Sequence, residues 1–367
     1  MESIVLEKNK EKKIVKKEGN TQKTFLTTLK QEHVKVGVAG IGYWGPNLMR
    51  NFAAENRVKL SAICDLDKNR MMKIGSQYPS AKQFLDYENF LEEVDAVAIS
   101  TPVDMHYKLA KMALEAGKHC LIEKPMTSTV AQAEELINIA KKNSLVLAVD
   151  HTFLFTGAVR KIKEYLDSGE LGEIWYYDSV RINLGLFQRD INVVWDLAPH
   201  DLSIMDYLIG KEASSLVCLG TSHVPSGHAD VAYLNLEFGN GFVANFHVNW
   251  LSPVKIRSII IGGSKKMLVY DDMNPMNKIL IYDKGIDLEH ISKEREYEAL
   301  VHYRTGDMLA PAVSQTEALK LETENFVSAI LGTTDLVSNG EAGLRVVKLL
   351  EASDKSLARF GARVRIC

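Results

Sequence analysis

The sequence has few cysteines, and none of them is arranged as a disulfide framework or a metal site would require. Cys64, Cys120, Cys218 and Cys367 are the four cysteines of the 367-residue chain, and they form no C-x-x-C pair or Cys/His cluster. Cys64 and Cys120 fall within apolar runs, which is the usual setting of a buried, reduced thiol. We therefore expect neither disulfides nor a bound metal.

The sequence also lacks an excess of charge and any long apolar run. Its 44 Lys and Arg residues balance 47 Asp and Glu residues, for a net charge of -3, which argues against nucleic acid as a partner. No apolar run approaches the length of a membrane span. The N-terminal stretch has no apolar signal core, and its glutamates argue against a transit peptide. These absences favour a cytoplasmic protein without a membrane partner.

What remains is an ordinary globular composition, with 46% hydrophobic residues, in a chain long enough for two domains. Residues 1–33 differ from the rest, because they mix lysine and glutamate with little periodicity. We interpret them as a charged, mobile extension. The alternative is an arm that binds a partner.

Residues 34–152 alternate short apolar runs with amphipathic stretches. The expected strands cover residues 34–40, 59–65, 95–100, 119–125 and 145–151. Strand–helix repetition of this kind predicts an α/β Rossmann domain, with a doubly wound parallel sheet.

Residues 153–367 follow a different pattern. The alternating segment 173–185 predicts a strand, and Gly239-Asn240-Gly241 separates two strands of a hairpin. Two helices are expected near the C-terminus, over 318–332 and 340–361. This pattern predicts an α+β domain with a large, mostly antiparallel sheet covered by helices on one side.

The segment Gly40-Ile41-Gly42-Tyr43-Trp44-Gly45 has the pattern G-x-G-x-x-G between an expected strand and an expected helix. In that context the first glycine permits a tight turn, and the second lets the backbone approach a pyrophosphate. The third packs helix against strand, and N–H groups at the helix start hold the anion. The alternative is a tight turn that binds no ligand.

Asp65 ends the next strand, 20 residues after Gly45. A carboxylate there is placed to accept hydrogen bonds from the adenosine ribose, and its charge repels a 2′-phosphate. The pattern therefore favours NAD over NADP as the cofactor. Arg70 lies close enough to soften that repulsion.

Further polar segments follow the strands at the sheet edge where such folds bind ligands. They are Ser100-Thr101-Pro102 with His106, then Glu123-Lys124-Pro125, and Trp195-Asp196-Leu197-Ala198-Pro199-His200-Asp201 in the second half. We expect the first two segments to border the cofactor, and the lysine ammonium to point over the cofactor cleft.

Asp196 and His200 are spaced i, i+4, so one helical turn places both on one face. Pro199 is expected in the first turn of that helix, where proline is tolerated. A solvent-exposed Lys124 and a capping or surface His200 are the alternatives that the residues themselves leave open.

Four segments in this order resemble the Gfo/Idh/MocA family of oxidoreductases: GVAGIGYWG, STPVDMH, EAGKHCLIEKP and WDLAPHD. The resemblance runs from about Val34 to Leu357. It implies that Lys124 and His200, with Asp196 beside them, act on the substrate hydroxyl being oxidised. Glu123 is expected to place the cofactor or the lysine.

Within this family, the stretch 149–155 and the segment VRINLGLFQRDINVVWDLAPHD look more like the nucleotide-sugar 3-dehydrogenases than the inositol dehydrogenases. Those enzymes act on UDP-N-acetylglucosamine or related sugars. The resemblance makes His151, Arg181, Asn183 and Gln188 candidate substrate contacts. It also implies a homodimer or homotetramer, because family members pair through the C-terminal sheet.

Two other readings stay open from the sequence. One is a dehydrogenase of a free or phosphorylated sugar or of inositol. The other is a regulator that binds a dinucleotide without catalysis, which would have no need for a lysine and a histidine aimed at a hydroxyl.

Overall fold

The computed structural model describes residues 33–185, 191–224, 227–239, 241–287 and 302–366. His33–Cys367 forms one compact unit. Gln188 and all but the last residue of the expected N-terminal extension lie outside the described residues.

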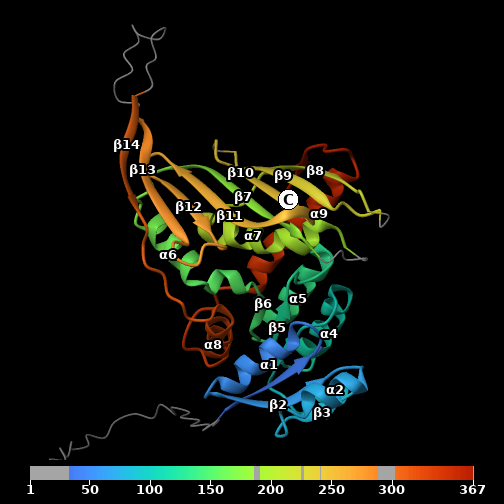
Figure 1. Ribbon diagram of the computed structural model, residues 1–367. Coiled ribbons are helices and arrows are strands. Elements are labelled where there is room, and N and C mark those ends of the chain that lie inside the picture. The colour runs from blue at the N-terminus through green and yellow to red at the C-terminus, as the bar shows by residue number, and fades with distance from the viewer. Residues whose placement is uncertain (1–32, 186–190, 225–226, 240, 288–301, 367) are drawn as a thin grey trace, which may run out of the picture. The chain divides into compact units, whose positions relative to one another are not determined.

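The first half contains a six-stranded parallel sheet in the order β3-β2-β1-β4-β5-β6, as expected for a doubly wound dinucleotide fold (Figure 1). The strands are β1 Val34–Ala39, β2 Val58–Cys64, β3 Lys82–Phe84, β4 Ala96–Ile99, β5 His119–Glu123 and β6 Leu147–Asp150. The prediction of the parallel sheet is confirmed. The three-residue edge strand β3 was not foreseen, because Lys-Gln-Phe has no apolar run.

Helices follow the strands of this half, and the short helix α3 was not expected from the sequence. They are α1 Gly45–Ala54, α2 Lys68–Gly75, α3 Tyr87–Leu91, α4 Val103–Glu115 and α5 Val130–Lys142. The Thr129 side chain caps α5 by accepting a hydrogen bond from the backbone N–H of Gln132. Gly117 follows α4 with a φ of 74°, in the left-handed region that glycine adopts freely.

The second half is built on a nine-stranded sheet in the order β14-β13-β12-β11-β7-β10-β9-β8-β15. The strands are β7 Ile174–Leu184, β8 Ser215–Thr221, β9 Val231–Glu237, β10 Val243–Asn249, β11 Leu251–Gly263, β12 Met267–Asp271, β13 Ile279–Asp287, β14 His302–Leu309 and β15 Val364–Arg365. Strands β7 and β10 pair in parallel, and the other pairs are antiparallel. The mostly antiparallel sheet is therefore confirmed.

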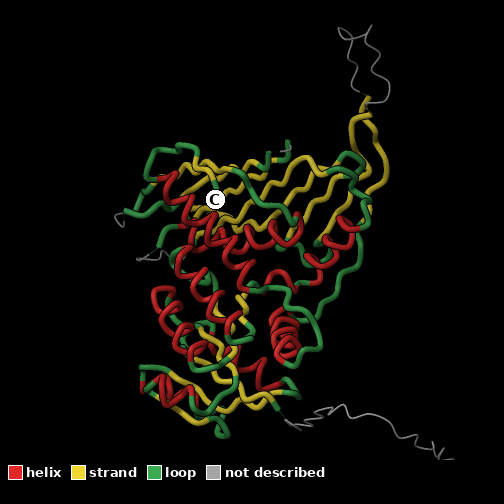
Figure 2. Tube along the Cα trace, turned by 180° about the vertical axis from the view of Figure 1, so that it is seen from behind, coloured by secondary structure: helices red, strands yellow, loops and turns green. Residues whose placement is uncertain are grey.

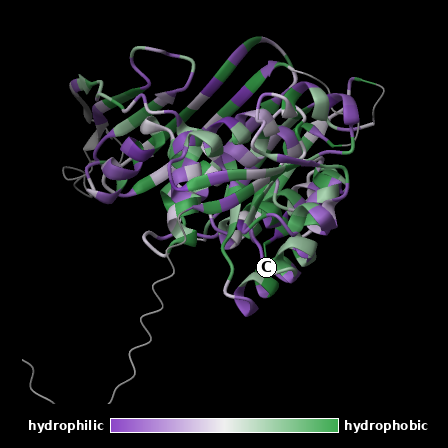
Figure 3. Ribbon diagram, turned by 90° about the horizontal axis from the view of Figure 1, so that it is seen from below, coloured by the Kyte–Doolittle hydropathy of each residue, from purple (hydrophilic) through white to green (hydrophobic). Residues whose placement is uncertain are grey.

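Helices cover one face of this sheet, as Figure 2 shows from behind. The helical elements after β6 are η1 Thr152–Phe155 (a 3₁₀ turn), α6 Gly157–Asp167, α7 Val193–Ile209, α8 Ala318–Ile330 and α9 Gly340–Leu357. Along β9 the side chains of Ala232 and Leu234 are buried, whereas Tyr233 between them is 54% exposed. The same alternation appears as bands of hydropathy along the strands in Figure 3.

Helix α8 packs onto α1, although 263 residues of chain separate them. The rings of Phe52 and Phe326 meet edge to face at 6.3 Å, and Arg50 forms an ion pair with Glu317 just before α8. Val327 is fully buried in the core beneath α1. A helix from the C-terminal part of the chain thus lies against the helix that follows the glycine loop.

Within the described ranges, no helix is long and apolar enough to cross a membrane. The same residues contain no group of three or more histidine, cysteine or acidic side chains that could hold a metal ion. Cys64, Cys120 and Cys218 are free and buried.

Candidate active site

The three glycines of the loop between β1 and α1 meet three different constraints. Gly40 has a φ of 86°, and a Cβ there would lie 2.5 Å from the Ser100 carbonyl oxygen. A Cβ on Gly45 would lie 2.1 Å from the carbonyl oxygen of Gly40. A Cβ on Gly42 would meet only Arg70, at 4.0 Å. Gly40 and Gly45 are thus required by the fold, whereas the space at Gly42 suits a pyrophosphate.

Asp65 ties this loop to the end of β2. One carboxylate oxygen accepts the backbone N–H of Ile41 at 2.9 Å, and the other accepts that of Asp67 at 2.8 Å. The Arg70 guanidinium lies 3.1 Å from the same carboxylate. Asp65 thus holds the loop in shape, and its carboxylate is paired with Arg70.

The two aromatic residues of the loop, Tyr43 and Trp44, differ in exposure. Tyr43 is 94% exposed. Trp44 is half-buried, and its indole N–H donates to the Asp150 carboxylate at 2.6 Å. The loop is therefore anchored to the carboxyl end of β6.

At the end of β4, the hydroxyls of Ser100 and Thr101 are buried and have no hydrogen-bond partner among the described residues. Pro102 caps the start of α4. A Cβ on Gly45 would lie 3.6 Å from the Ser100 hydroxyl. Unpartnered hydroxyls at the glycine loop fit a polar cofactor, since buried polar groups are costly without a partner.

His106 of α4 joins two of the predicted segments. It is buried, with Nδ1 2.9 Å from the Pro125 carbonyl oxygen and Nε2 2.8 Å from that of Thr101. Burial lowers the pKa of His106. The side chain therefore fixes the loop after β4 against the loop that carries Lys124, a bridge that the sequence did not reveal.

The ammonium of Lys124 reaches across to helix α7. Its Nζ donates to the Asp196 carbonyl oxygen at 3.0 Å and lies 3.8 Å from the Asp196 carboxylate. The peptide bond between Lys124 and Pro125 is cis. Beside it, burial raises the pKa of Glu123 to about 8, although the charge of Lys124 opposes the shift.

Asp196 and His200 both lie in α7, so the expected i, i+4 placement on one helical turn is present. The expectation for Pro199 was wrong, because α7 already begins at Val193 and Pro199 lies in its interior. The Asn192 side chain caps the helix two turns earlier than the proline suggested. Pro199 lacks the N–H that would bond to the carbonyl of Trp195, so the helical ladder is interrupted beside Asp196.

His200 lies among cationic and aromatic groups. Its ring meets that of Phe153 edge to face at 5.1 Å. Burial and then the charge of Lys124 hold the pKa of His200 well below its usual range. The imidazole of His200 is therefore held in its neutral form.

The candidate substrate residues have unequal surroundings. His151 is 1% exposed, and neither of its ring nitrogens has a partner among the described residues. Burial lowers the pKa of His151 to about 3. Arg181 is buried and makes two hydrogen bonds of 2.8 Å to Asp201. Asn183 is half-buried near the end of β7.

Comparison with known proteins agrees with this geometry. Residues 34–151 match the model of the oxidoreductase family with an NAD-binding Rossmann fold, and residues 159–269 match the GFO/IDH/MocA C-terminal domain. The UDP-N-acetylglucosamine 3-dehydrogenase of Acidithiobacillus ferrooxidans is 30% identical over 319 residues, which cover 86% of this chain and 94% of the relative. The chain belongs to the Gfo/Idh/MocA family.

This Gfo/Idh/MocA protein is therefore an oxidoreductase with an NAD-binding Rossmann domain. A solved structure of the Acidithiobacillus enzyme superposes with a TM-score of 0.74 at 28% identity, covering 89% of this chain and 99% of that one. The myo-inositol 2-dehydrogenase of Thermotoga maritima is 24% identical over 337 residues, 88% of this chain and 96% of the relative.

Two further residues of this Gfo/Idh/MocA protein, Phe153 and Arg257, lie at the candidate site and were not identified from the sequence. The Phe153 ring packs against the guanidinium groups of Arg181, at 4.6 Å, and Arg257, at 5.7 Å. Arg257 comes from β11, which pairs with β7 beside Arg181. Strand register brings Arg257 beside Arg181, and η1 carries Phe153 to both, so no local motif could have signalled these contacts.

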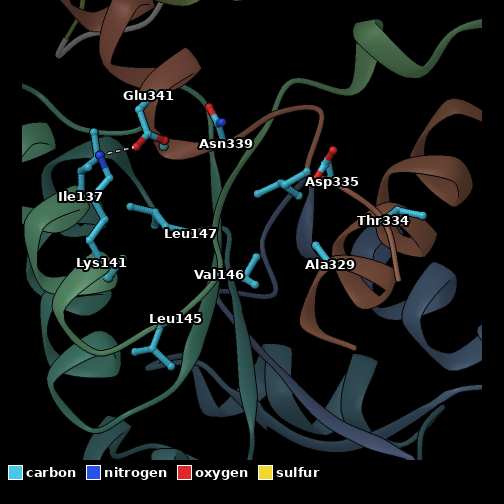
Figure 4. A pocket seen from close by; sticks show the side chains of 13 residues that line it. Ile137, Lys141, Leu145, Val146, Leu147, Ala329, Thr334, Asp335, Asn339 and Glu341 are labelled. Atoms are coloured by element: carbon cyan, nitrogen blue, oxygen red, sulfur yellow. Dashed lines mark ion pairs between the residues drawn. The ribbon is translucent and has the colours of Figure 1, made fainter. Parts of the chain in front are cut away.

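A separate cavity of about 320 Å³ lies between α5, β6 and the segment that joins α8 to α9. Figure 4 shows Leu147 at this cavity and the ion pair between Lys141 and Glu341 at its side. Leu147 begins β6, whereas Asp150 ends it at the edge where Lys124 lies. This cavity is therefore distinct from the candidate site.

Proposed function

We propose that this protein uses NAD to oxidise a secondary hydroxyl, at C3, of a nucleotide sugar such as UDP-N-acetylglucosamine. The observation that carries the proposal is the meeting of Lys124, from the end of β5, with Asp196 and His200 of α7. The similarity to a UDP-N-acetylglucosamine 3-dehydrogenase supports the choice of substrate.

The residues fit the two transfers that alcohol oxidation needs. When bound, the dinucleotide supplies the acceptor for the hydride that leaves the carbon. The neutral imidazole of His200 accepts the hydroxyl proton. The ammonium of Lys124 orients the hydroxyl and stabilises the developing alkoxide, with Asp196 holding the ammonium in place. The products are a ketone, a reduced nicotinamide and a protonated histidine.

We assign NAD rather than NADP as the preferred cofactor, because the Asp65 carboxylate is held at the end of β2. The pairing of Arg70 with Asp65 supports this assignment, since the guanidinium is then engaged and less available to a 2′-phosphate. Asp65→Ala should narrow the difference between the two affinities. Tighter binding of NADP than of NAD by the unmodified protein would contradict the assignment.

The substrate contacts proposed are His151, Arg181, Asn183 and Gln188. The unpartnered ring nitrogens of His151 support its inclusion, because a hydroxyl could bond to either of them. The guanidinium of Arg181 already donates to Asp201. We therefore propose that Arg181 acts by positioning the ring of Phe153, against which it packs, rather than by donating to the substrate.

We further propose that the protein assembles as a homodimer or homotetramer through the face of the nine-stranded sheet that the helices leave open. Leu219, Tyr233 and Ile260 are exposed there, at 55%, 54% and 39%. An antiparallel sheet with apolar groups on its second face gains by covering them. Light scattering at micromolar concentration tests this, and a mass of 41.0 kDa, that of the monomer, would refute it.

The function is tested by thermal shift and by NADH formation. NAD, NADP, UDP-N-acetylglucosamine, UDP-glucose, free glucose and myo-inositol are each added to the protein, because a bound ligand raises the unfolding temperature. We expect a shift with NAD, a further shift with UDP-N-acetylglucosamine, and NADH formation with both. If NADH formed only with myo-inositol or a free sugar, that compound would be the substrate in place of the nucleotide sugar. A shift in unfolding temperature with NAD but no turnover on any substrate would favour a regulator.

A further inference from the structure

Helix α8 carries a carboxyl group that the proposed reaction does not use. Glu322 is 2% exposed. It lies beside Asp150 at the end of β6 and Thr152 at the start of η1. The Thr152 hydroxyl donates to Asp150, and no other donor among the described residues reaches either oxygen of Glu322. An ionised Glu322 would thus be a buried charge without hydrogen bonds.

The carboxylate of Asp150, in contrast to that of Glu322, has hydrogen-bond donors at both oxygens. One of its oxygens accepts the indole N–H of Trp44 at 2.6 Å, and the other accepts the hydroxyl of Thr152. The proton that these two neighbouring acids can share therefore belongs on Glu322, where it supplies a donor facing Asp150.

The surrounding charges point the same way. Burial first, and then the negative charge of Asp150, raise the pKa of Glu322 well above its usual range. Glu123 of β5 adds to the effect, and the nearby Thr152 hydroxyl, which donates to Asp150, opposes it. On α1, which also packs against α8, Arg50 is paired with Glu317 rather than with Glu322. No cation in the described surroundings is paired with Glu322.

We propose that Glu322 is a positioning residue for the dinucleotide loop: in its protonated form it donates to Asp150, which in turn anchors Trp44 of the loop. The chain of contacts runs from α8 through β6 to the segment Gly40–Gly45. It joins the C-terminal part of the chain to the loop proposed to hold the pyrophosphate. The inference rests on that proposed dinucleotide site for its functional consequence, but not for the existence of the acid pair.

The arrangement has a consequence for stability that does not involve a cofactor. Unfolded Glu322 ionises near its ordinary value of 4.5, whereas the folded group keeps its proton to a higher pH. Between these two pKa values the folded state binds more protons than the unfolded state, so stability falls as pH rises. Glu322→Gln keeps a donor without an ionisable proton. The Glu322→Gln variant should therefore not show this fall of stability with rising pH.

The consequence for binding appears above the folded pKa of Glu322. There the two carboxylates repel each other, and the anchor of Trp44 loosens. NAD affinity should then fall on going to alkaline pH in the unmodified protein, but not in Glu322→Gln. Glu322→Ala removes the donor at every pH and should weaken NAD binding by roughly three- to tenfold already at pH 7, the worth of one buried hydrogen bond.

The experiment uses the full chain and its Glu322→Gln and Glu322→Ala variants, with Glu324→Gln as a matched control on the same helix. Glu324 pairs with Lys320 one turn away, so its substitution should follow the unmodified protein throughout. Unfolding temperatures are measured from pH 5 to pH 9 without cofactor, and NAD affinity is measured by calorimetry over the same range. We expect Glu322→Gln to equal the parent at pH 5 and to exceed its unfolding temperature increasingly as pH rises.

A Glu322→Gln variant that is less stable than the parent at pH 7 to 9 would show that Glu322 is ionised, and would overturn the inference. So would an NAD affinity of Glu322→Ala equal to that of the parent. If the protein binds no NAD at all, the proposed function fails, while the pH dependence of stability still decides whether the acid pair shares a proton.

Discussion

The glycine loop and the proposed catalytic cluster (Lys124, Asp196 and His200) are built in contrasting ways. In the loop, the N–H of Ile41 and the indole of Trp44 already have carboxylate acceptors within the protein. Around the catalytic cluster, both ring nitrogens of His151 and one oxygen of Glu123 are buried without partners. The anchored N–H groups hold the loop in shape, whereas the unpartnered groups, and with them the hydroxyls of Ser100 and Thr101 at the end of β4, are where a bound ligand can supply the missing hydrogen bonds.

The largest effect is expected at His200, since the proton transfer depends on it. His200→Asn should lower turnover by roughly two to four orders of magnitude, the usual worth of a general base. NAD affinity should stay unchanged, because we expect no contact between α7 and the dinucleotide. Steady-state rates of NADH formation and calorimetry with NAD measure the two quantities. Near-full turnover in this variant would move the base to another residue, such as His151.

Lys124→Met should lower turnover comparably, because the alkoxide loses its cation. It tests whether the catalytic cluster works as a unit. If Lys124 and His200 act on one hydroxyl, the double variant should lose less than the product of the two single losses. Full multiplicativity of the two losses would mean that the residues act in separate steps.

Substitutions of Gly42 and Gly45 separate the binding role of the loop from its structural role. Gly42→Val should weaken NAD binding by about tenfold or more with little loss of stability, because the space there suits the pyrophosphate. Gly45→Ala should instead lower the free energy of unfolding by roughly 1–3 kcal/mol, since its Cβ would clash with the Gly40 carbonyl. Urea denaturation and NAD calorimetry on both variants separate the two roles. If Gly42→Val instead lowered stability and Gly45→Ala weakened NAD binding, the roles assigned to the two glycines would be exchanged.

The smallest effect concerns His151 and the acid side of the stability profile. Its pKa is about 3 in the fold and 6.5 ordinarily. Between these values the unfolded state binds the extra proton, so stability falls as pH falls, by at most about 1.4 kcal/mol per pH unit. His151→Asn should reduce this loss between pH 6.5 and pH 5, as measured by urea midpoints. An unchanged slope would mean that His151 is accessible enough to be protonated in the fold.

The same contrast explains what the sequence could predict. The glycine loop is contiguous, and its strand before and helix after are local signals, so Gly40, Gly42, Gly45 and Asp65 could be assigned roles before the fold was known. The parallel, doubly wound sheet follows from the same alternation. The short strand β3 escaped because three residues carry no periodicity.

The surroundings of the catalytic cluster were harder to predict, because they depend on contacts between distant segments. Resemblance to a family selected Lys124 and His200, but no motif announced that Phe153 would pack between Arg181 and Arg257. Likewise, Glu322 lies in an amphipathic helix whose sequence shows no sign of Asp150. Pro199 was misplaced because proline alone favours a helix start, whereas Asn192 caps α7 earlier.

The most direct test of the central claim follows the hydrogen that leaves the sugar. UDP-N-acetylglucosamine carrying deuterium at C3 is incubated with NAD and the protein, and the reduced cofactor is analysed by mass spectrometry. The reduced cofactor should carry the deuterium, and the unlabelled sugar should react faster than the labelled one. Reduced cofactor without deuterium, or no reduction with this sugar under conditions where NAD binds, would contradict that claim.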